Sequence, residues 1–230
     1  MHGAAPTVFI VDDAAEVRKS LSRVLGAAGY QVRSFESAEG FLAEHHGDTQ
    51  GCLLLDICMP GLSGMELQHA LVRSPNALPI VFLTGMGDIQ TSVDAMKEGA
   101  VDFLTKPIDN VRLFAAVDQA LRRDEEQRVQ VEIRRLIHHR LETLTPRERQ
   151  VMAQVIRGRL NKQIAAELGT GEKTVKVHRA RMMSKMVARS VAELVQLGAR
   201  VGVEIEPALG SGTTALSWRQ PQRPISKEFD

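Results

Sequence analysis

Short apolar segments alternate with helical patterns through the first half of the chain. The apolar segments lie at Thr7–Val11, Gln31–Phe35, Cys52–Leu55, Ile80–Leu83 and Val101–Leu104. Helical patterns lie between them at Ala14–Ala28, Ala38–His45, Met65–Val72 and Ile89–Lys97, and a fifth begins near Val111. Apolar strands that alternate with helices indicate a parallel sheet covered on both faces. We therefore expect an α/β domain with five parallel strands over residues 1–122.

Polar side chains stand where the strands of this predicted sheet end. They are Asp12 and Asp13 after the first strand, Asp56 after the third, Thr84 after the fourth and Lys106 after the fifth. Open parallel sheets place their chemistry at the carboxyl ends of the strands, so these side chains should meet at one edge. Crowded carboxylates repel one another unless a cation is present, and Mg²⁺ prefers oxygen ligands. We predict a Mg²⁺ site with Asp13, Asp56 and the backbone carbonyl of Cys58 as ligands, and Asp12 acting through water.

Such a site suits the transfer of a phosphoryl group. An aspartate carboxylate can attack phosphorus and form an acyl phosphate, and we expect Asp56 to be this acceptor. Mg²⁺ and the Lys106 ammonium would neutralise charge on the transferred oxygens. We expect the Thr84 hydroxyl to turn toward the phosphoryl oxygen, and Phe103 to move into the space that Thr84 leaves.

Charge is distributed unevenly along the chain. Residues 1–123 hold 10 Lys and Arg against 15 Asp and Glu, whereas residues 143–200 hold 12 against 4. A compact basic segment can lie along a phosphate backbone, so residues 143–200 are the candidate for DNA binding. No apolar run reaches the length of a membrane span, and two cysteines do not make a disulfide framework. We expect a cytoplasmic protein without a membrane partner.

The basic segment has a purely helical pattern. Thr145, Pro146 and Glu148 form a capping-box start for its first helix. A short helix over Lys162–Leu168, a turn that contains glycine, and a longer helix over Glu172–Met186 make a helix-turn-helix pattern, and a last helix follows Ser190. We therefore predict an all-α, four-helix DNA-binding domain over residues 143–200.

The longer helix has two differently composed sides. Val175, Met182, Met183 and Met186 share one side and should lie in the core. Lys176 can donate to a guanine edge, and Val177 and Ala180 can touch thymine methyl groups. The other expected DNA-binding residues would mostly contact phosphates or support the helix; they are Lys173, Thr174, His178, Arg181 and Lys185.

The remaining segments leave alternatives open. Residues 123–142 begin with a charged run and then resume an apolar pattern. A helix that continues as the linker fits this pattern, and so does a solvated helix that breaks into a flexible connector. Residues 201–230 are rich in Pro, Gly, Ser and Thr, which favours a disordered tail, with a partner-binding tail as the alternative.

Several motifs resemble known families. Asp12-Asp13, Leu55–Gly64, Thr84-Gly85 and Thr105-Lys106-Pro107 resemble the receiver domain of response regulators. Leu144–Arg149, Asn161–Ala165, Lys173–His178 and Ala188–Ser190 resemble a LuxR-type helix-turn-helix. Together they resemble the FixJ/NarL class of two-component regulators, most of all its FixJ branch. Gly171, Thr170 and Val187 depart from the LuxR-type pattern, which more often has Ser or Thr, a hydrophobic residue and glycine at these places.

The resemblance implies a function. It implies a flavodoxin-like receiver fold, phosphorylation of Asp56 by a partner histidine kinase, and a homodimer formed through the fourth helix, fifth strand and fifth helix. The phosphorylated dimer would bind two half-sites at a promoter and, with RNA polymerase, activate transcription. The chain would not be an enzyme, beyond assisting the Mg²⁺-dependent phosphorylation and dephosphorylation of its own aspartate.

Two other classes of protein are alternatives to a response regulator. A flavodoxin-like phosphatase carries its aspartyl nucleophile on the first strand in an Asp-x-Asp pattern, which Asp12-Asp13-Ala14 lacks. A transcription factor that binds a small quorum-sensing ligand would need an aromatic pocket, and aromatic residues make up only 4% of this chain. Turnover of a small phosphate ester would favour the first of these alternatives.

Overall fold

The computed structural model describes residues 5–45, 49–72, 77–85, 96–204 and 217–218. The chain divides into two compact units, Met1–Val131 and Glu132–Asp230. Within the described ranges, no helix combines the length and the apolar character needed to cross a membrane.

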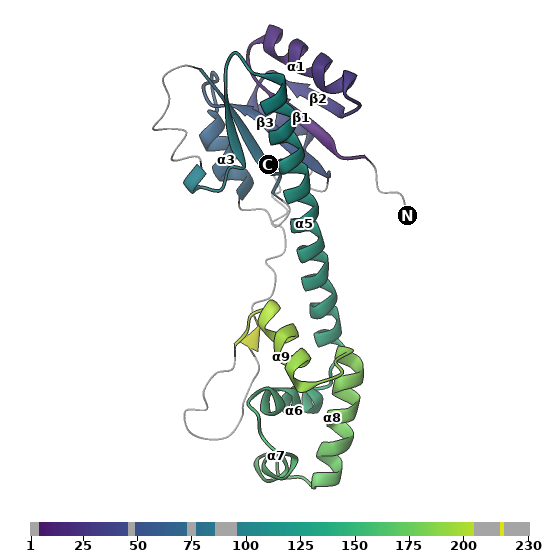
Figure 1. Cartoon of the computed structure of the whole chain (residues 1–230). Coiled ribbons are helices and arrows are strands. Elements are labelled where there is room, and N and C mark those ends of the chain that lie inside the picture. The colour runs from purple at the N-terminus through teal and green to yellow at the C-terminus, as the bar shows by residue number, and fades with distance from the viewer. Residues whose placement is uncertain (1–4, 46–48, 73–76, 86–95, 205–216, 219–230) are drawn as a thin grey trace. The chain divides into compact units, whose positions relative to one another are not determined.

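The first unit is built on one parallel sheet (Figure 1). Its strands are β1 (Thr7–Val11), β2 (Gln31–Phe35), β3 (Gly51–Asp56), β4 (Ile80–Thr84) and β5 (Asp102–Thr105). They lie in the order β2-β1-β3-β4-β5, which confirms the predicted five-stranded parallel fold. Because the chain moves outward from β1 in both directions, the carboxyl ends of β1 and β3 flank the point where a doubly wound sheet binds its ligands.

Helices cover both faces of the sheet because its strands are apolar on both sides. Phe9 and Phe82 belong to a core cluster that includes residues of α2 (Ala38–Glu44) and α3 (Gly64–Val72). Val8 and Val81 belong to a second cluster, with residues of α1 (Ala15–Ala27) and the start of α5 (Asn110–Glu142). The alternation of strand side chains between the two clusters follows the two-residue period of a strand.

Local signals fix some helix starts. Ser63 and Glu66 exchange hydrogen bonds at the start of α3, as a capping box does. Gly64 must be glycine, because a Cβ there would lie 2.2 Å from the carbonyl oxygen of Asp56. The predicted helix Ile89–Lys97 lies outside the described residues except for its last two.

The segment after the sheet is one long helix. α5 runs without a break over Asn110–Glu142, a length of 33 residues. Of the two alternatives for residues 123–142, the continuous helix is therefore the one observed. Leu113, Ala116 and Val117 pack on the sheet, whereas Ile137 and Leu141 belong to the core of the second unit.

The second unit is a small helical domain. It contains α6 (Pro146–Ile156), α7 (Asn161–Glu167), α8 (Glu172–Met186) and α9 (Val191–Arg200), which confirms the all-α fold expected there. The capping box between Thr145 and Glu148 opens α6. α7 and α8 are joined by a short turn in which Gly169 has a φ of +61°. Val175, Met182 and Met186 of α8 are fully buried, and Met183 packs against them from the edge of the core.

The tail contributes one short element. Val203–Glu204 (β6) pairs with Ser217–Trp218 (β7) in an antiparallel ladder, although residues 201–230 were expected to lack regular structure. The expectation of a disordered tail otherwise concerns residues 205–216 and 219–230, which lie outside the described part of the chain.

Candidate functional site

Three carboxylates meet at the carboxyl edge of the sheet. Asp12 and Asp13 follow β1, and Asp56 is the last residue of β3. One ligand atom from each lies within 4.8 Å of the others. Asp12 and Asp56 are buried, whereas Asp13 is exposed. The cluster is therefore open to solvent on the side of Asp13 and closed beneath.

Lys106 joins two of these carboxylates. Its Nζ lies 2.8 Å from Asp12 Oδ2 and 2.8 Å from Asp56 Oδ2. The backbone places it there, because β4 pairs with β5 up to Thr84 and Thr105, and the Lys106 N–H donates to the Thr84 carbonyl at 2.8 Å. Burial acts to lower the pKa of Lys106, but its hydrogen bonds to Asp12 and Asp56 outweigh burial and raise that pKa above its ordinary value.

The charge on Asp56 is only partly compensated. Burial raises the pKa of Asp56 above its ordinary value, the contact with Lys106 opposes that rise, and the nearby charge of Asp12 adds to it. The Cys58 N–H also donates to Asp56 Oδ1 at 3.3 Å. The carboxylate thus lies in a site where additional positive charge would be favourable.

The donor set fits Mg²⁺. Lys106 balances one of three crowded negative charges, and carboxylate and carbonyl oxygens are the ligands that this hard cation takes. The structure brings together Asp13 and Asp56, the predicted side-chain ligands, and Asp12, which is predicted to act through water. The ligand role of the Cys58 carbonyl stays a prediction.

The two residues expected to respond to phosphorylation lie beside this site. Thr84 is buried at the end of β4, and its hydroxyl donates to the Gly85 carbonyl at 3.1 Å. Phe103 is half-buried on β5, pairs with Phe82 across the ladder and packs against the core beneath the site. Neither side chain bonds to Asp56, so the predicted movement of both remains a prediction.

A further contact at the site was not expected from the sequence. The Arg18 guanidinium donates from Nη1 to the carbonyl oxygens of Asp12, at 2.6 Å, and Asp13, at 2.9 Å. Arg18 lies on α1, where a basic residue in a run of charges predicts a solvated face. The signal in the sequence is only its position, one helical turn after Ala14.

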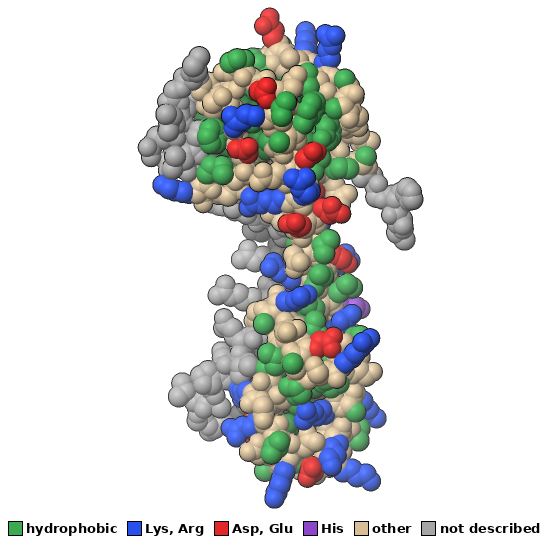
Figure 2. Space-filling view, viewed as in Figure 1, with side chains coloured by type: hydrophobic (Ala, Val, Ile, Leu, Met, Phe, Trp, Pro, Cys, Tyr) green, Lys and Arg blue, Asp and Glu red, His purple; other side chains and the backbone are tan. Residues whose placement is uncertain are grey.

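The second candidate site is the outer face of α8. Six of the eight residues expected to bind DNA are exposed on it: Lys173, Thr174, Lys176, Val177, Ala180 and Arg181. Among the charged side chains visible on the second unit in Figure 2, Lys and Arg predominate over Asp and Glu. Lys176 forms an exposed ion pair with Glu172 at 3.4 Å, which is weak enough for a DNA phosphate or base to replace it.

The other two expected contacts are partly buried. Lys185 Nζ donates to Glu148 Oε2 at 2.7 Å and to the Thr143 carbonyl at 2.9 Å, so it ties α8 to the start of α6. His178 is half-buried. Arg179, which precedes the exposed Ala180, donates to Asn161 Oδ1 at 2.9 Å and joins α8 to α7. These contacts support the helix, whereas the exposed side chains can reach a ligand.

Comparison with known proteins adds to this geometry. The family described as "Response regulator receiver domain" matches residues 8–118, and the family described as "Bacterial regulatory proteins, luxR family" matches residues 142–197. The chain is 43% identical over 196 residues to nodulation protein W of Bradyrhizobium diazoefficiens, which covers 85% of this chain and 86% of that protein. It is 41% identical to the transcriptional regulatory protein FixJ of the same organism, over 85% of this chain and 96% of FixJ.

A solved structure is similar over both units. The response regulator StyR superposes with a TM-score of 0.75 and is 46% identical, covering 86% of this chain and all of the StyR chain. The similarity therefore includes the strand ends that carry the carboxylates and the helices that carry the basic face.

Proposed function

Because the chain belongs to the FixJ-type response regulators, and is therefore a phosphorylation-controlled transcription regulator that binds DNA through a LuxR-type helix-turn-helix, we propose that Asp56 is its phosphoacceptor and that the exposed face of α8 reads the DNA. The observation that carries the proposal is the meeting of three carboxylates and Lys106 at one edge of the sheet. Members of this family are regulators rather than classical enzymes.

The proposed reaction is a transfer between two side chains. A carboxylate oxygen of Asp56 attacks the phosphorus of a phosphohistidine on the partner kinase; the new O–P bond forms, the P–N bond breaks, and the imidazole takes up a proton. Lys106 lies within 2.8 Å of the accepting carboxylate and can hold a phosphoryl oxygen after transfer. Asp13, Asp56 and the Cys58 carbonyl would hold Mg²⁺, with Asp12 acting through water, and the bound ion supplies positive charge for the phosphoryl oxygens.

Phosphorylation is proposed to alter Thr84 and Phe103. A phosphoryl group on Asp56 offers the Thr84 hydroxyl a stronger acceptor than the Gly85 carbonyl that it now uses. Phe103, half-buried on the neighbouring strand, would follow into the vacated space. The reshaped surface would favour a homodimer, which places two α8 helices on two half-sites of a promoter. We place this activity in the cytoplasm, with RNA polymerase as the further partner and activation as the outcome.

DNA affinity with and without phosphorylation tests this function. Binding sequences are first selected from random duplexes with protein treated with acetyl phosphate and Mg²⁺, and affinity is then measured by fluorescence anisotropy. We expect phosphorylation to increase affinity by about 5- to 150-fold, since an allosteric coupling free energy is typically 1–3 kcal/mol. Asp56→Asn should abolish the increase, and Glu125→Gln, which removes an exposed carboxylate near the opposite end of β3, should preserve it. Equal affinity in both states of the wild-type protein would contradict the proposal.

A further inference from the structure

Arg18 contacts the turn that carries two of the three carboxylates. It is the fourth residue of α1, and its single Nη1 atom donates to both carbonyl oxygens of the Asp12-Asp13 pair, at 2.6 and 2.9 Å. Hydrogen bonds from a charged donor are shorter and about twice as strong as neutral ones. The side chain is half-buried, so the contact is partly shielded from solvent.

The same turn is held from the other side by the backbone. The Ala14 N–H donates to Asp12 Oδ1 at 2.9 Å, and the Arg18 N–H donates to the Ala14 carbonyl at 3.1 Å. The guanidinium therefore completes a set of bonds that fixes the direction of both peptide carbonyls, and with them the direction in which both carboxylates leave the backbone.

The two carboxylates depend on this turn to different degrees. Asp12 is buried and is also held by Lys106 at 2.8 Å. Asp13 is exposed, and among the residues that the structure describes no hydrogen bond or ion pair to its carboxylate is present. The orientation of Asp13 toward the cluster therefore rests on its own backbone, and Arg18 holds the carbonyl of that residue.

We propose that Arg18 is a positioning residue, which acts through the two carbonyls to aim Asp12 and Asp13 at the cation that the phosphoryl site uses. The inference rests on the proposed function and deepens it. Partners that orient metal ligands commonly affect metal affinity by about 10–100-fold when they are removed.

Charge alone predicts the opposite effect. A guanidinium near a cation site repels a divalent cation, so removing its charge would strengthen cation binding if electrostatic repulsion were its main influence. If Arg18 positions the carboxylates, removing it weakens cation binding in spite of the lost repulsion. The direction of the change in affinity therefore separates the two roles.

The test is the binding of Mg²⁺ to the unphosphorylated full chain, measured by isothermal titration calorimetry. Arg18→Met keeps the aliphatic stem and removes both the charge and the donors. We expect its Mg²⁺ dissociation constant to rise about tenfold. Lys19→Met removes the exposed neighbouring charge and is the matched control, with an affinity close to that of the wild type. Arg18→Lys keeps the charge on a shorter side chain and should lie between the wild type and Arg18→Met.

A kinetic measurement separates positioning from a merely structural role. In phosphorylation by acetyl phosphate, Arg18→Met should need about tenfold more Mg²⁺ for half the maximal rate, with a smaller change in that maximal rate. An Mg²⁺ affinity of Arg18→Met that is equal to or tighter than that of the wild type would overturn the inference. If Arg18→Met does not fold, Arg18→Lys decides in the same way: weakened Mg²⁺ binding supports the inference, and unchanged binding overturns it.

Failure of the proposed function would show in the wild-type chain, whereas failure of the inference would show only in the Arg18 variants. If the wild-type chain neither binds Mg²⁺ nor accepts a phosphoryl group, the function and the inference both fall. If the wild type does both and Arg18→Met matches it, only the role of Arg18 is overturned.

Discussion

Lys185 and Lys176 lie on the same helix, nine residues apart, and their surroundings give them different tasks. Lys176 is exposed and paired only with Glu172 on its own helix, whereas Lys185 donates to Glu148, whose side chain is 3% exposed. A buried carboxylate needs a partner, because an unpaired buried charge is strongly destabilising. Lys185 is thus held by the fold, and its predicted DNA contact would compete with that bond.

The Lys185–Glu148 pair predicts how acid affects the second unit. Burial acts to raise the pKa of Glu148, but the bonds from Lys185 and Thr145 outweigh it, so the pKa is lower in the folded chain than in the unfolded one. The stabilisation is therefore present above the ordinary glutamate pKa of about 4.3 and is lost as pH falls through the folded value. Glu148→Gln should destabilise this unit by about 1–2 kcal/mol at neutral pH, and by less in acid. This cost is smaller than that of breaking a fully buried ion pair, because Lys185 is partly exposed to solvent.

Hydrogen exchange of the α6 amides in the full chain measures this difference, with the variant and the wild type compared at the same pH. Glu172→Gln, which removes an exposed pair, is the control and should change exchange little. A difference between Glu148→Gln and the wild type that is the same at neutral and acid pH would contradict the assignment.

Individual site residues differ in how well the sequence predicts them. Asp12, Asp56 and Lys106 could be grouped because each follows a strand, and a parallel sheet brings strand ends together whatever the rest of the fold does. The contact of Arg18 with two carbonyls and the bond of Lys185 to Glu148 depend on where a helix packs and on a rotamer. Neither is encoded in a local pattern, so both appear only in three dimensions.

At the scale of elements, α5 shows where a local pattern is misleading. The charged run Arg122–Arg128 is compatible with a solvated segment, which was one of the two alternatives for this part of the chain, yet Asp124 within it is only 4% exposed. Its carboxylate accepts from the Gly51 N–H at 3.0 Å and from Arg128 Nε at 2.8 Å, and Arg128 also donates to the Thr49 carbonyl at 2.7 Å. These bonds tie α5 to the start of the strand that ends in Asp56.

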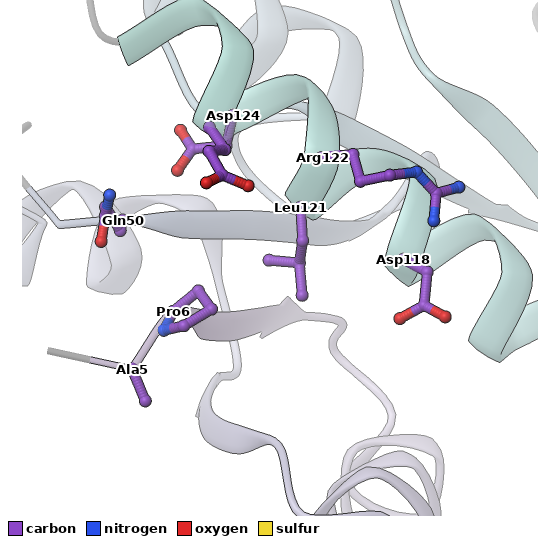
Figure 3. Close-up of a pocket in the computed structure, with 8 residues that line it drawn as sticks. Ala5, Pro6, Gln50, Asp118, Leu121, Arg122 and Asp124 are labelled. Carbon is purple, nitrogen blue, oxygen red and sulfur yellow. The ribbon is translucent and has the colours of Figure 1, made fainter. Parts of the chain in front are cut away.

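The same region holds a pocket of about 520 Å³. Figure 3 shows Asp118, Leu121, Arg122 and Asp124 of α5 opposite Ala5, Pro6 and Gln50. Asp118 is exposed and accepts from the Tyr30 hydroxyl at 2.6 Å, which together with burial raises the pKa of Tyr30 to about 12. Two aspartates on the same helix, six residues apart, thus differ sharply in burial.

That difference predicts unequal effects of two substitutions. Asp124→Ala leaves the buried Gly51 N–H without its acceptor and should destabilise the first unit by about 2–3 kcal/mol. Asp118→Ala removes a more exposed bond and should cost about 1 kcal/mol or less. Hydrogen exchange of the β3 amides in the full chain gives both values; equal effects of the two substitutions would show that the burial of Asp124 contributes nothing.

Elements with a strong local signal were predicted well. The apolar strands, the capping box at Thr145, and the helices on either side of Gly169 all follow from short-range chemistry. The continuity of α5 through residues 123–142 could not be decided, because a charged helix and a flexible connector have similar compositions. Val187 enters the left-handed region with a φ of 55° although it is not glycine, since the fold overrides local preference there.

At the scale of the whole molecule, two units of different chemistry share one chain. The first presents a cluster of carboxylates that suits a cation and a phosphoryl group, and the second presents a basic helix that suits DNA. The sequence predicts a basic domain from residue 143 because the net charge changes sign there, whereas the second unit of the structure begins at Glu132. How a phosphoryl group on one unit alters the other depends on surfaces that no local pattern encodes.

The most direct test of the account is to locate the phosphoryl group. Full-length protein is phosphorylated with acetyl phosphate and Mg²⁺, the acyl phosphate is reduced with borohydride to homoserine, and the modified residue is identified by peptide mass spectrometry. We expect homoserine at position 56 and nowhere else. When a chelator removes Mg²⁺, we expect no reduction product. Modification at another residue, or at Asp56 regardless of Mg²⁺, would contradict the account.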